Sequence, residues 1–174
     1  MPGYHKLVAY SDAAVIPYPT QEQRISQTRY LATLCHGMGI DCPRISLIHC
    51  SEHIDERHFP HTGGYADIIE RGRQGEFGPC IIDGPLDLKT SMCPESLAVK
   101  GIDSPVGGDA DALVFPDIEA ANVFHKTITL LASARIAAVL QGPDVPVVMP
   151  SRGDDADSKY YSLALAALQS LKNA

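Results

Sequence analysis

Short, almost wholly apolar runs alternate along this chain with segments of helical periodicity, and this alternation limits the folds it can adopt. Runs that are apolar at nearly every position are typical of strands whose two faces are both covered by helices. Strands that alternate with helices predict an α/β fold with a largely parallel sheet flanked by helices. The strand candidates are residues 6–10, 44–49, 80–83, 112–115, 136–140 and 145–148.

The first helix carries its own start and stop signals. The run Thr20-Gln21-Glu22-Gln23 has the pattern of a capping box, in which the ends of the first turn bond each other's backbone. Gly37 and Gly39 are suited to end that helix. Its apolar face is predicted at Ile25, Tyr30, Leu31 and Leu34, and further helices near residues 66–74, 94–100, 118–132 and 156–172.

Composition excludes several classes of function. The 174 residues suit one domain, or one domain and a fragment, and carry a formal net charge of −7. Without a basic block, this balance argues against nucleic acid or a membrane surface as the main partner. No apolar run approaches the roughly 20 residues that cross a bilayer, and no signal-peptide core is visible at the N-terminus. The five cysteines are irregularly spaced, which favours reduced thiols and a cytoplasmic location.

The run Ser151-Arg152-Gly153 has the character of an anion site. It follows an apolar strand candidate and precedes the acid-rich start of the last predicted helix. A helix N-terminus carries partial positive charge, and an arginine can hold phosphate oxygens through two parallel hydrogen bonds. The alternative is an ordinary strand–helix junction with an arginine at the surface.

Two further junctions follow predicted strands. We expect 83–86 to form a tight turn into a helix, and Asp117 to act as an N-cap. In open α/β sheets, ligands bind beyond the carboxyl ends of the strands, where Asp83, Asp117 and Ser151 are expected. The polar segment 51–77 is predicted to be a surface loop region.

Histidines and a cysteine gather in one short segment and suggest a metal site. Their spacings do not match the pairs found in structural zinc sites. A histidine-rich loop without metal is therefore preferred over zinc. The residues concerned are His49, Cys50, His53, His58 and His61.

Several separate motifs, in order, resemble the phosphate acetyl/butyryltransferase family, and the butyryltransferase branch most. They span nearly the whole chain, although family members are about twice as long and this chain resembles only their C-terminal half. The motifs are residues 11–15, 18–23, 82–86, 101–111, 115–126, 141–142 and 151–153.

The resemblance implies an enzyme that moves an acyl group between coenzyme A and inorganic phosphate: acyl-CoA + phosphate ⇌ acyl phosphate + CoA. CoA enters as a substrate, and neither an organic cofactor nor a metal is implied. The implied architecture has two α/β domains, like isocitrate and isopropylmalate dehydrogenases. Residues 1–140 would resemble the second domain, and 141–174 would be a strand–helix segment that returns to the first.

The resemblance also assigns roles to residues. Arg152 would contact the phosphate and the oxyanion, and Ser151 would hydrogen-bond the same oxygens or the carbonyl. Asp157 is a candidate for the base that deprotonates the CoA thiol; a solvated carboxylate that stabilises the helix dipole is the alternative.

Four more residues are candidates for binding CoA or phosphate. Lys126 matches a family lysine near CoA, and Asn122 lies one turn before it on the same helix face. Gly107 and Gly108 would let the backbone approach a ligand closely. The alternatives are a solvated surface lysine and a plain turn.

Two hypotheses about function follow. The chain is a phosphate acyltransferase, acting as an unusual homodimer or with a separate N-terminal half, or it is a non-catalytic acyl-CoA-binding remnant or regulatory domain. An NAD-dependent dehydrogenase would rest on fold kinship alone. The last helix carries an apolar stripe that should be buried against the chain's own sheet or a second copy, at Tyr161, Ala164, Leu165, Leu168 and Leu171.

Overall fold

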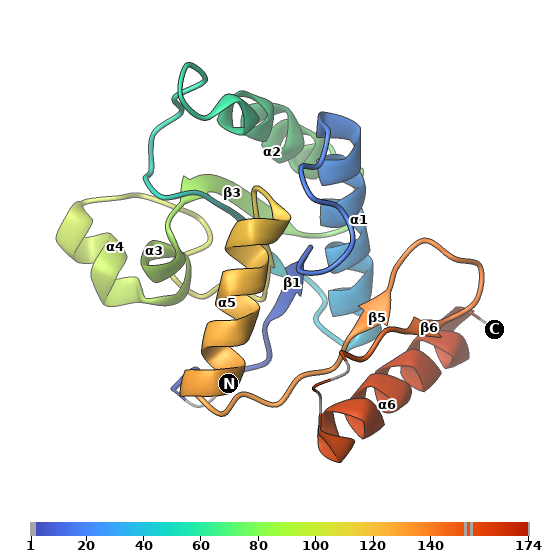
Figure 1. The fold of residues 1–174 in the computed structure, drawn as a ribbon. Coiled ribbons are helices and arrows are strands. Elements are labelled where there is room, and N and C mark those ends of the chain that lie inside the picture. The colour runs from blue at the N-terminus through green and yellow to red at the C-terminus, as the bar shows by residue number, and fades with distance from the viewer. Residues whose placement is uncertain (1–2, 152, 154, 174) are drawn as a thin grey trace. The chain divides into compact units, whose positions relative to one another are not determined.

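The computed structural model describes residues 3–151, 153 and 155–173. The chain divides into two compact units (Figure 1). One comprises Lys6–His125, and the other comprises Met1–His5 and Lys126–Ala174 so far as these are described. Within the described residues, no helix is both long and apolar enough to span a membrane.

The unit of Lys6–His125 is built on a four-stranded sheet in the order β1-β4-β2-β3, and every pair in it is parallel. Ala112 in β4 aligns with Ala9 of β1 on one side and with Ile45 of β2 on the other. The predicted α/β fold with a largely parallel sheet is confirmed. The strands are β1 (Ala9–Ser11), β2 (Arg44–Ile48), β3 (Ile81–Leu86) and β4 (Ala112–Val114).

Helices cover both faces of this sheet (Figure 1). Side chains alternate along a strand, so Ile45 and Leu47 enter the core beneath one pair of helices while Ser46 faces the opposite way. Ser46 Oγ lies 2.6 Å from Ser91 Oγ on that second face. The first face carries α1 (Gln21–Gly37) and α2 (Tyr65–Arg73), and the second carries α3 (Leu88–Met92) and α5 (Ile118–Leu131); η1 (Pro60–Gly64) and α4 (Pro94–Lys100) lie in the connections.

The predicted capping box opens α1. The Thr20 hydroxyl accepts the Gln23 N–H at 3.3 Å, and the Thr20 N–H donates to the Gln23 side chain at 2.8 Å. Ile25 and Leu31 are buried as predicted, but Tyr30 is 37% exposed, which corrects its place on the apolar face. The buried face is completed by the small residues Thr28, Ala32 and Cys35, which let the helix pack closely on the sheet.

The tight turn predicted at residues 83–86 is wrong, because β3 continues through Leu86. Asp83 pairs with Ser46 inside the sheet, so it does not lie beyond a carboxyl end. A proline fits here because β3 is an edge strand and its register with β2 shifts between Ser46 and Ile48. The turn comes later, where Asp87 caps α3 by accepting the Thr90 N–H at 2.6 Å.

In the second unit, β5 (Val139–Leu140) and β6 (Val147–Val148) form a separate two-stranded sheet. They pair antiparallel, with Leu140 opposite Val147, so these two candidates do not extend the parallel sheet. The connection between them is too short for the crossover that a parallel pair needs. The long helix α6 (Ala156–Asn173) packs against both strands.

The face that α6 turns toward these strands differs from the predicted stripe. Among the described side chains of α6, Ser162 and Ala166 are buried, and the Ser162 hydroxyl accepts the Ala138 N–H at 2.9 Å. Small residues one turn apart let the helix approach the strands closely. Ala164 and Leu168 are exposed, and the side chain of Leu171 lies outside the described residues. Tyr161 and Leu165 are half-buried, so the described part of the stripe is only partly covered by the chain's own strands.

Candidate functional site

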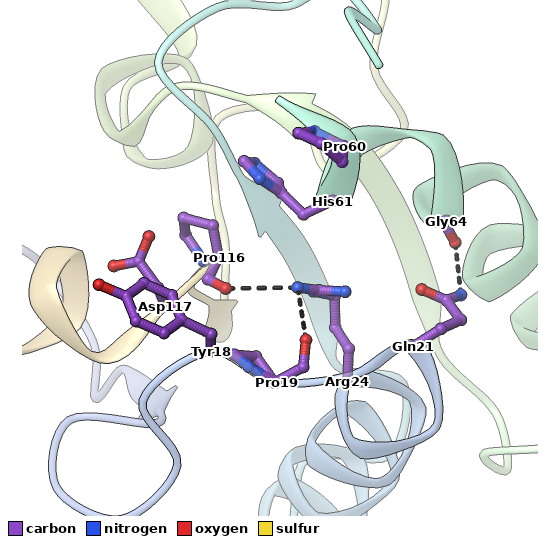
Figure 2. Close-up of a pocket in the computed structure, with 9 residues that line it drawn as sticks. All are labelled: Tyr18, Pro19, Gln21, Arg24, Pro60, His61, Gly64, Pro116 and Asp117. Atoms are coloured by element: carbon purple, nitrogen blue, oxygen red, sulfur yellow. Dashed lines mark hydrogen bonds between the residues drawn. The ribbon is translucent and has the colours of Figure 1, made fainter. Parts of the chain in front are cut away.

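A pocket of about 540 Å³ opens beside the carboxyl ends of β1, β2 and β4, within the unit of Lys6–His125 (Figure 2). Each segment of its wall follows one of these strands. This is the edge at which α/β sheets bind ligands. The pocket is lined by Tyr18, Pro19, Gln21, Arg24, Pro60, His61, Gly64, Pro116 and Asp117.

Arg24 is the most unusual residue in this wall, because its side chain is charged yet only 4% exposed. It extends from the first turns of α1, and its Nη2 donates to the carbonyls of Pro19 at 3.2 Å and Pro116 at 3.3 Å. Its Nε is buried and has no hydrogen-bond partner among the described residues. The guanidinium is thus fixed in place with donor capacity left over.

No described carboxylate lies within ion-pair distance of Arg24. Burial lowers the pKa of Arg24, while Tyr65 and Asp117 act in the opposite direction. The guanidinium lies 6.0 Å from the centroid of the Tyr65 ring, which offers a weak cation–π contact. A buried cation with so little compensation creates a demand for negative charge.

His61 lies across the pocket from Arg24 (Figure 2). Its Nε2 is 3.3 Å from Nδ1 of His49, which follows β2. Burial, with the nearby charges of Arg24 and His49, lowers the pKa of His61 to about 4. The His61 ring is therefore neutral at pH 7 and contributes no positive charge to the pocket besides that of Arg24.

Polar contacts fix the rim of the pocket. Asp117 Oδ1 accepts the Ala120 N–H at 2.8 Å, which confirms the predicted N-cap of α5. The Tyr18 hydroxyl donates to Glu119 at 3.0 Å, and Gln21 donates to the Gly64 carbonyl at 2.8 Å. Both α1 and α5 therefore begin at this pocket, with their positive ends beside it.

Asn122 and Lys126, predicted to bind CoA or phosphate, lie on α5 beyond this rim. The Asn122 amide donates to the Ala13 carbonyl at 3.0 Å and so joins α5 to the loop after β1. Lys126 is exposed one turn later. The structure thus gives Asn122 a bracing contact and leaves the Lys126 ammonium at the surface.

Gly107 and Gly108, the other two candidates, lie in the loop that enters β4 at its amino end. They are consequently at the opposite edge of the sheet from Asn122. Both have left-handed backbone conformations, with φ of 67° and 68°. A Cβ on Gly108 would lie 2.5 Å from the Pro94 nitrogen, so close packing within the chain requires this glycine.

The predicted catalytic residues belong to the other unit. Ser151 follows β6 and is exposed, and its hydroxyl accepts the Gly153 N–H at 3.4 Å. Arg152 lies outside the described residues. Asp157 is exposed in the first turn of α6, where Asp155 provides the capping contact by accepting the Ser158 N–H at 2.7 Å.

The histidines separate into two groups. His49 and His61 contact each other, whereas His58 pairs with Asp55 at 2.8 Å on the surface. Cys50 Sγ lies 3.6 Å from His49 Nε2. Within the described residues, no three His, Cys, Asp or Glu side chains are placed to hold a metal ion together. Part of the predicted loop region 51–77 is helical, as η1 and α2.

Sequence reasoning missed Arg24. A signal was present, because Arg24 is seven residues before Leu31 and eleven before Cys35, on the face of α1 that packs on the sheet. A charged side chain on that buried face cannot reach bulk water, so its presence indicates a cavity or a ligand beside it.

Comparison with known proteins finds a family and several relatives that match nearly the whole of this chain. Residues 1–167 match the family described as phosphate acetyl/butaryl transferase. The chain is 34% identical over 168 residues to a phosphate acetyltransferase of Thermotoga maritima, covering 97% of this chain and 57% of that protein. It is 34% identical over 171 residues to a phosphate butyryltransferase of Clostridium beijerinckii, covering 98% and 56%.

Solved structures of proteins with related names have the same fold as this chain. A branched-chain phosphotransacylase from Enterococcus faecalis superposes with a TM-score of 0.83 at 28% identity, covering 92% of this chain and 59% of that one. A phosphotransacetylase from Streptococcus pyogenes gives 0.77 at 26% identity, covering 98% and 56%. The chain thus spans little more than half the length of the relatives it matches.

Proposed function

The chain belongs to the phosphate acetyl/butaryl transferase family, and we propose that it serves the transfer of an acyl group between coenzyme A and inorganic phosphate. The observation that carries this proposal is the family match over residues 1–167, together with relatives that are named acetyl- and butyryltransferases.

In the proposed reaction, a phosphate oxygen attacks the thioester carbonyl of acyl-CoA. A C–O bond forms, the C–S bond breaks, and CoA leaves as the thiolate. We assign Arg152 to hold the phosphate and the developing oxyanion, and Ser151 to hydrogen-bond the same oxygens. In the reverse direction Asp157 would take the proton of the CoA thiol. Asn122, Lys126, Gly107 and Gly108 remain proposed contacts for CoA or phosphate.

The proposal includes a larger assembly, because the chain spans only part of its relatives' length. We propose that residues 1–140 correspond to the second domain of a dehydrogenase-like architecture and that 141–174 return to a first domain. A homodimer or a separate N-terminal half would complete the site. The exposed side chains of Leu163 and Leu168 on α6 favour such an arrangement, because they offer an apolar face for it to cover.

The alternative function is binding of acyl-CoA without turnover, as a remnant or regulatory domain. The short span relative to the curated relatives favours it. Calorimetry separates the two, because binding of CoA without any acyl transfer supports the alternative.

The test is an assay of butyryl-CoA and acetyl-CoA with phosphate, following loss of the thioester absorbance. The full chain is assayed alone and with the part of the Thermotoga maritima relative that it does not cover. Arg152→Gln should abolish turnover, and the exposed Arg73→Gln is the matched control. Absence of turnover in every combination, with either acyl-CoA, would reject the proposal.

A further inference from the structure

We propose that the pocket around Arg24 is a binding site for a phosphate group carried on an organic molecule. It is distinct in sequence from Ser151-Arg152-Gly153 and lies wholly within the unit of Lys6–His125. This site rests on the proposed function in one respect only, the choice of CoA as the probe.

The first argument is the state of the guanidinium. Arg24 is 4% exposed, and its buried Nε has no partner among the described residues. A buried guanidinium that no carboxylate pairs is costly, and an anion in the pocket would lower that cost by neutralising the charge rather than by bonding the inaccessible Nε. The two carbonyls that accept from Nη2 hold the group in position without neutralising it.

The second argument is the field at the pocket. The N-termini of α1 and α5 both lie at its wall, and each is long enough to contribute a partial positive charge. Asp117 also lines the wall, and its charge offsets part of this field, although its Oδ1 is engaged by the Ala120 N–H. Neutral His61 leaves Arg24 as the one charged cation of the lining, so the site suits a single phosphate group.

The third argument is size. A volume of about 540 Å³ falls in the range of small-molecule sites, and a phosphate ion alone would leave most of it unfilled. Pro19, Pro60, Pro116 and Tyr18 supply apolar walls for the rest of a ligand. The pocket therefore suits a phosphate ester better than free phosphate.

The first measurement uses the unmodified chain, with His61 as the reporter. Its imidazole resonance is followed by NMR through pH titrations with coenzyme A, pantetheine and inorganic phosphate at matched ionic strength. The groups that face His61 are Arg24 on α1, His49 after β2, Asp117 after β4 and Tyr65 on α2. A phosphate beside Arg24 should raise the pKa of His61 from about 4, because its negative charge favours the imidazolium.

We expect coenzyme A to shift the His61 resonance saturably and pantetheine, which lacks phosphate, to leave it unchanged. If inorganic phosphate saturates the shift at the same concentrations, the pocket binds free phosphate rather than a phosphate ester. A His61 resonance that responds to no phosphate compound would overturn the inference.

The second measurement compares two variants by calorimetry with coenzyme A. Arg24→Gln should weaken binding by about tenfold or more, the effect of losing hydrogen bonds from a charged group. Arg73→Gln, at an arginine whose side chain is 71% exposed, should change affinity less than about twofold. Equal affinity of Arg24→Gln and the unmodified chain would overturn the inference. If Arg24→Gln does not fold, the His61 titration decides.

These results separate the site from the proposed function. A His61 response without turnover in any combination leaves the phosphate site standing and rejects the acyltransferase. Turnover that is unaffected by Arg24→Gln, with no His61 response, rejects the site and leaves the acyltransferase standing.

Discussion

Replacing Gly108 by alanine tests whether the loop before β4 is held by packing within the chain or is kept open for a ligand. The loop residues Gly101 and Gly108 have nearly the same backbone conformation, with φ of 65° and 68°. They differ in their surroundings. A Cβ at Gly101 meets nothing within 4 Å, whereas at Gly108 it lies 2.5 Å from the Pro94 nitrogen and 2.6 Å from the Cys93 carbonyl carbon.

The magnitudes follow from this contrast. Placing a Cβ in the left-handed region costs about 1–2 kcal/mol, partly offset by the smaller entropy of an unfolded chain with alanine. Gly101→Ala should therefore lower the free energy of unfolding by about 1 kcal/mol. Gly108→Ala carries the same conformational cost and adds about 1–3 kcal/mol of overpacking, because the neighbours are backbone atoms that cannot rotate away.

The assay is urea unfolding of both variants, followed by circular dichroism, with CoA affinity measured in parallel. We expect Gly108→Ala to be less stable than Gly101→Ala by about 2 kcal/mol, and the CoA affinity of its folded fraction decides whether the loop also contacts the ligand. Equal stability of the two variants would refute the close approach to Pro94. Loss of CoA affinity without loss of stability would instead support the ligand role predicted from sequence.

Three further outcomes are expected. Thr20→Ala removes one half of the capping box of α1 and should cost about 1 kcal/mol, seen as a drop in Tm of roughly 2–4 °C; an unchanged Tm would contradict that role. The lowered pKa of His61 means that the unfolded chain binds more protons between pH about 4 and about 6.5. Stability should therefore fall as pH drops through that window, and His61→Gln should flatten the dependence measured by urea unfolding; an equal slope in both proteins would contradict this. Burial raises the pKa of Cys35 to about 12, so iodoacetamide should label exposed Cys42 in the native chain and Cys35 only after unfolding, as read by peptide mass spectrometry; equally rapid native labelling of both would contradict it.

The sequence pattern correctly predicted elements that depend only on burial or on their own end residues. The unbroken apolar run of β4 (Ala112–Val114) predicted a strand because both faces of it are buried, so burial leaves no other pattern. The prediction of a helix near residues 94–100 is confirmed by α4, in which Pro94 begins the helix and Gly101 ends it in a left-handed conformation.

The errors in the strands fall where a partner strand decides the outcome. Gly84-Pro85 is a turn signal, yet it lies inside β3 because an edge strand with a register shift tolerates a proline. The runs at 136–140 and 145–148 look like the other strands, but they pair with each other. The residues of an apolar run do not specify which strand it will pair with. The one sequence feature that argues against a parallel pair is the short connection between the two runs, which leaves no room for a crossover.

Arg24 shows how far such reasoning reaches toward a site. Helical spacing places it on the buried face of α1, and that is computable from the sequence. The carbonyls that orient it belong to Pro19, beside it in sequence, and to Pro116, on a different strand connection. The second contact exists only because β1 and β4 are neighbours in the sheet, so that their carboxyl ends meet. A buried charge out of place in a helical pattern therefore marks where a ligand site can lie, while the sheet order determines what surrounds it.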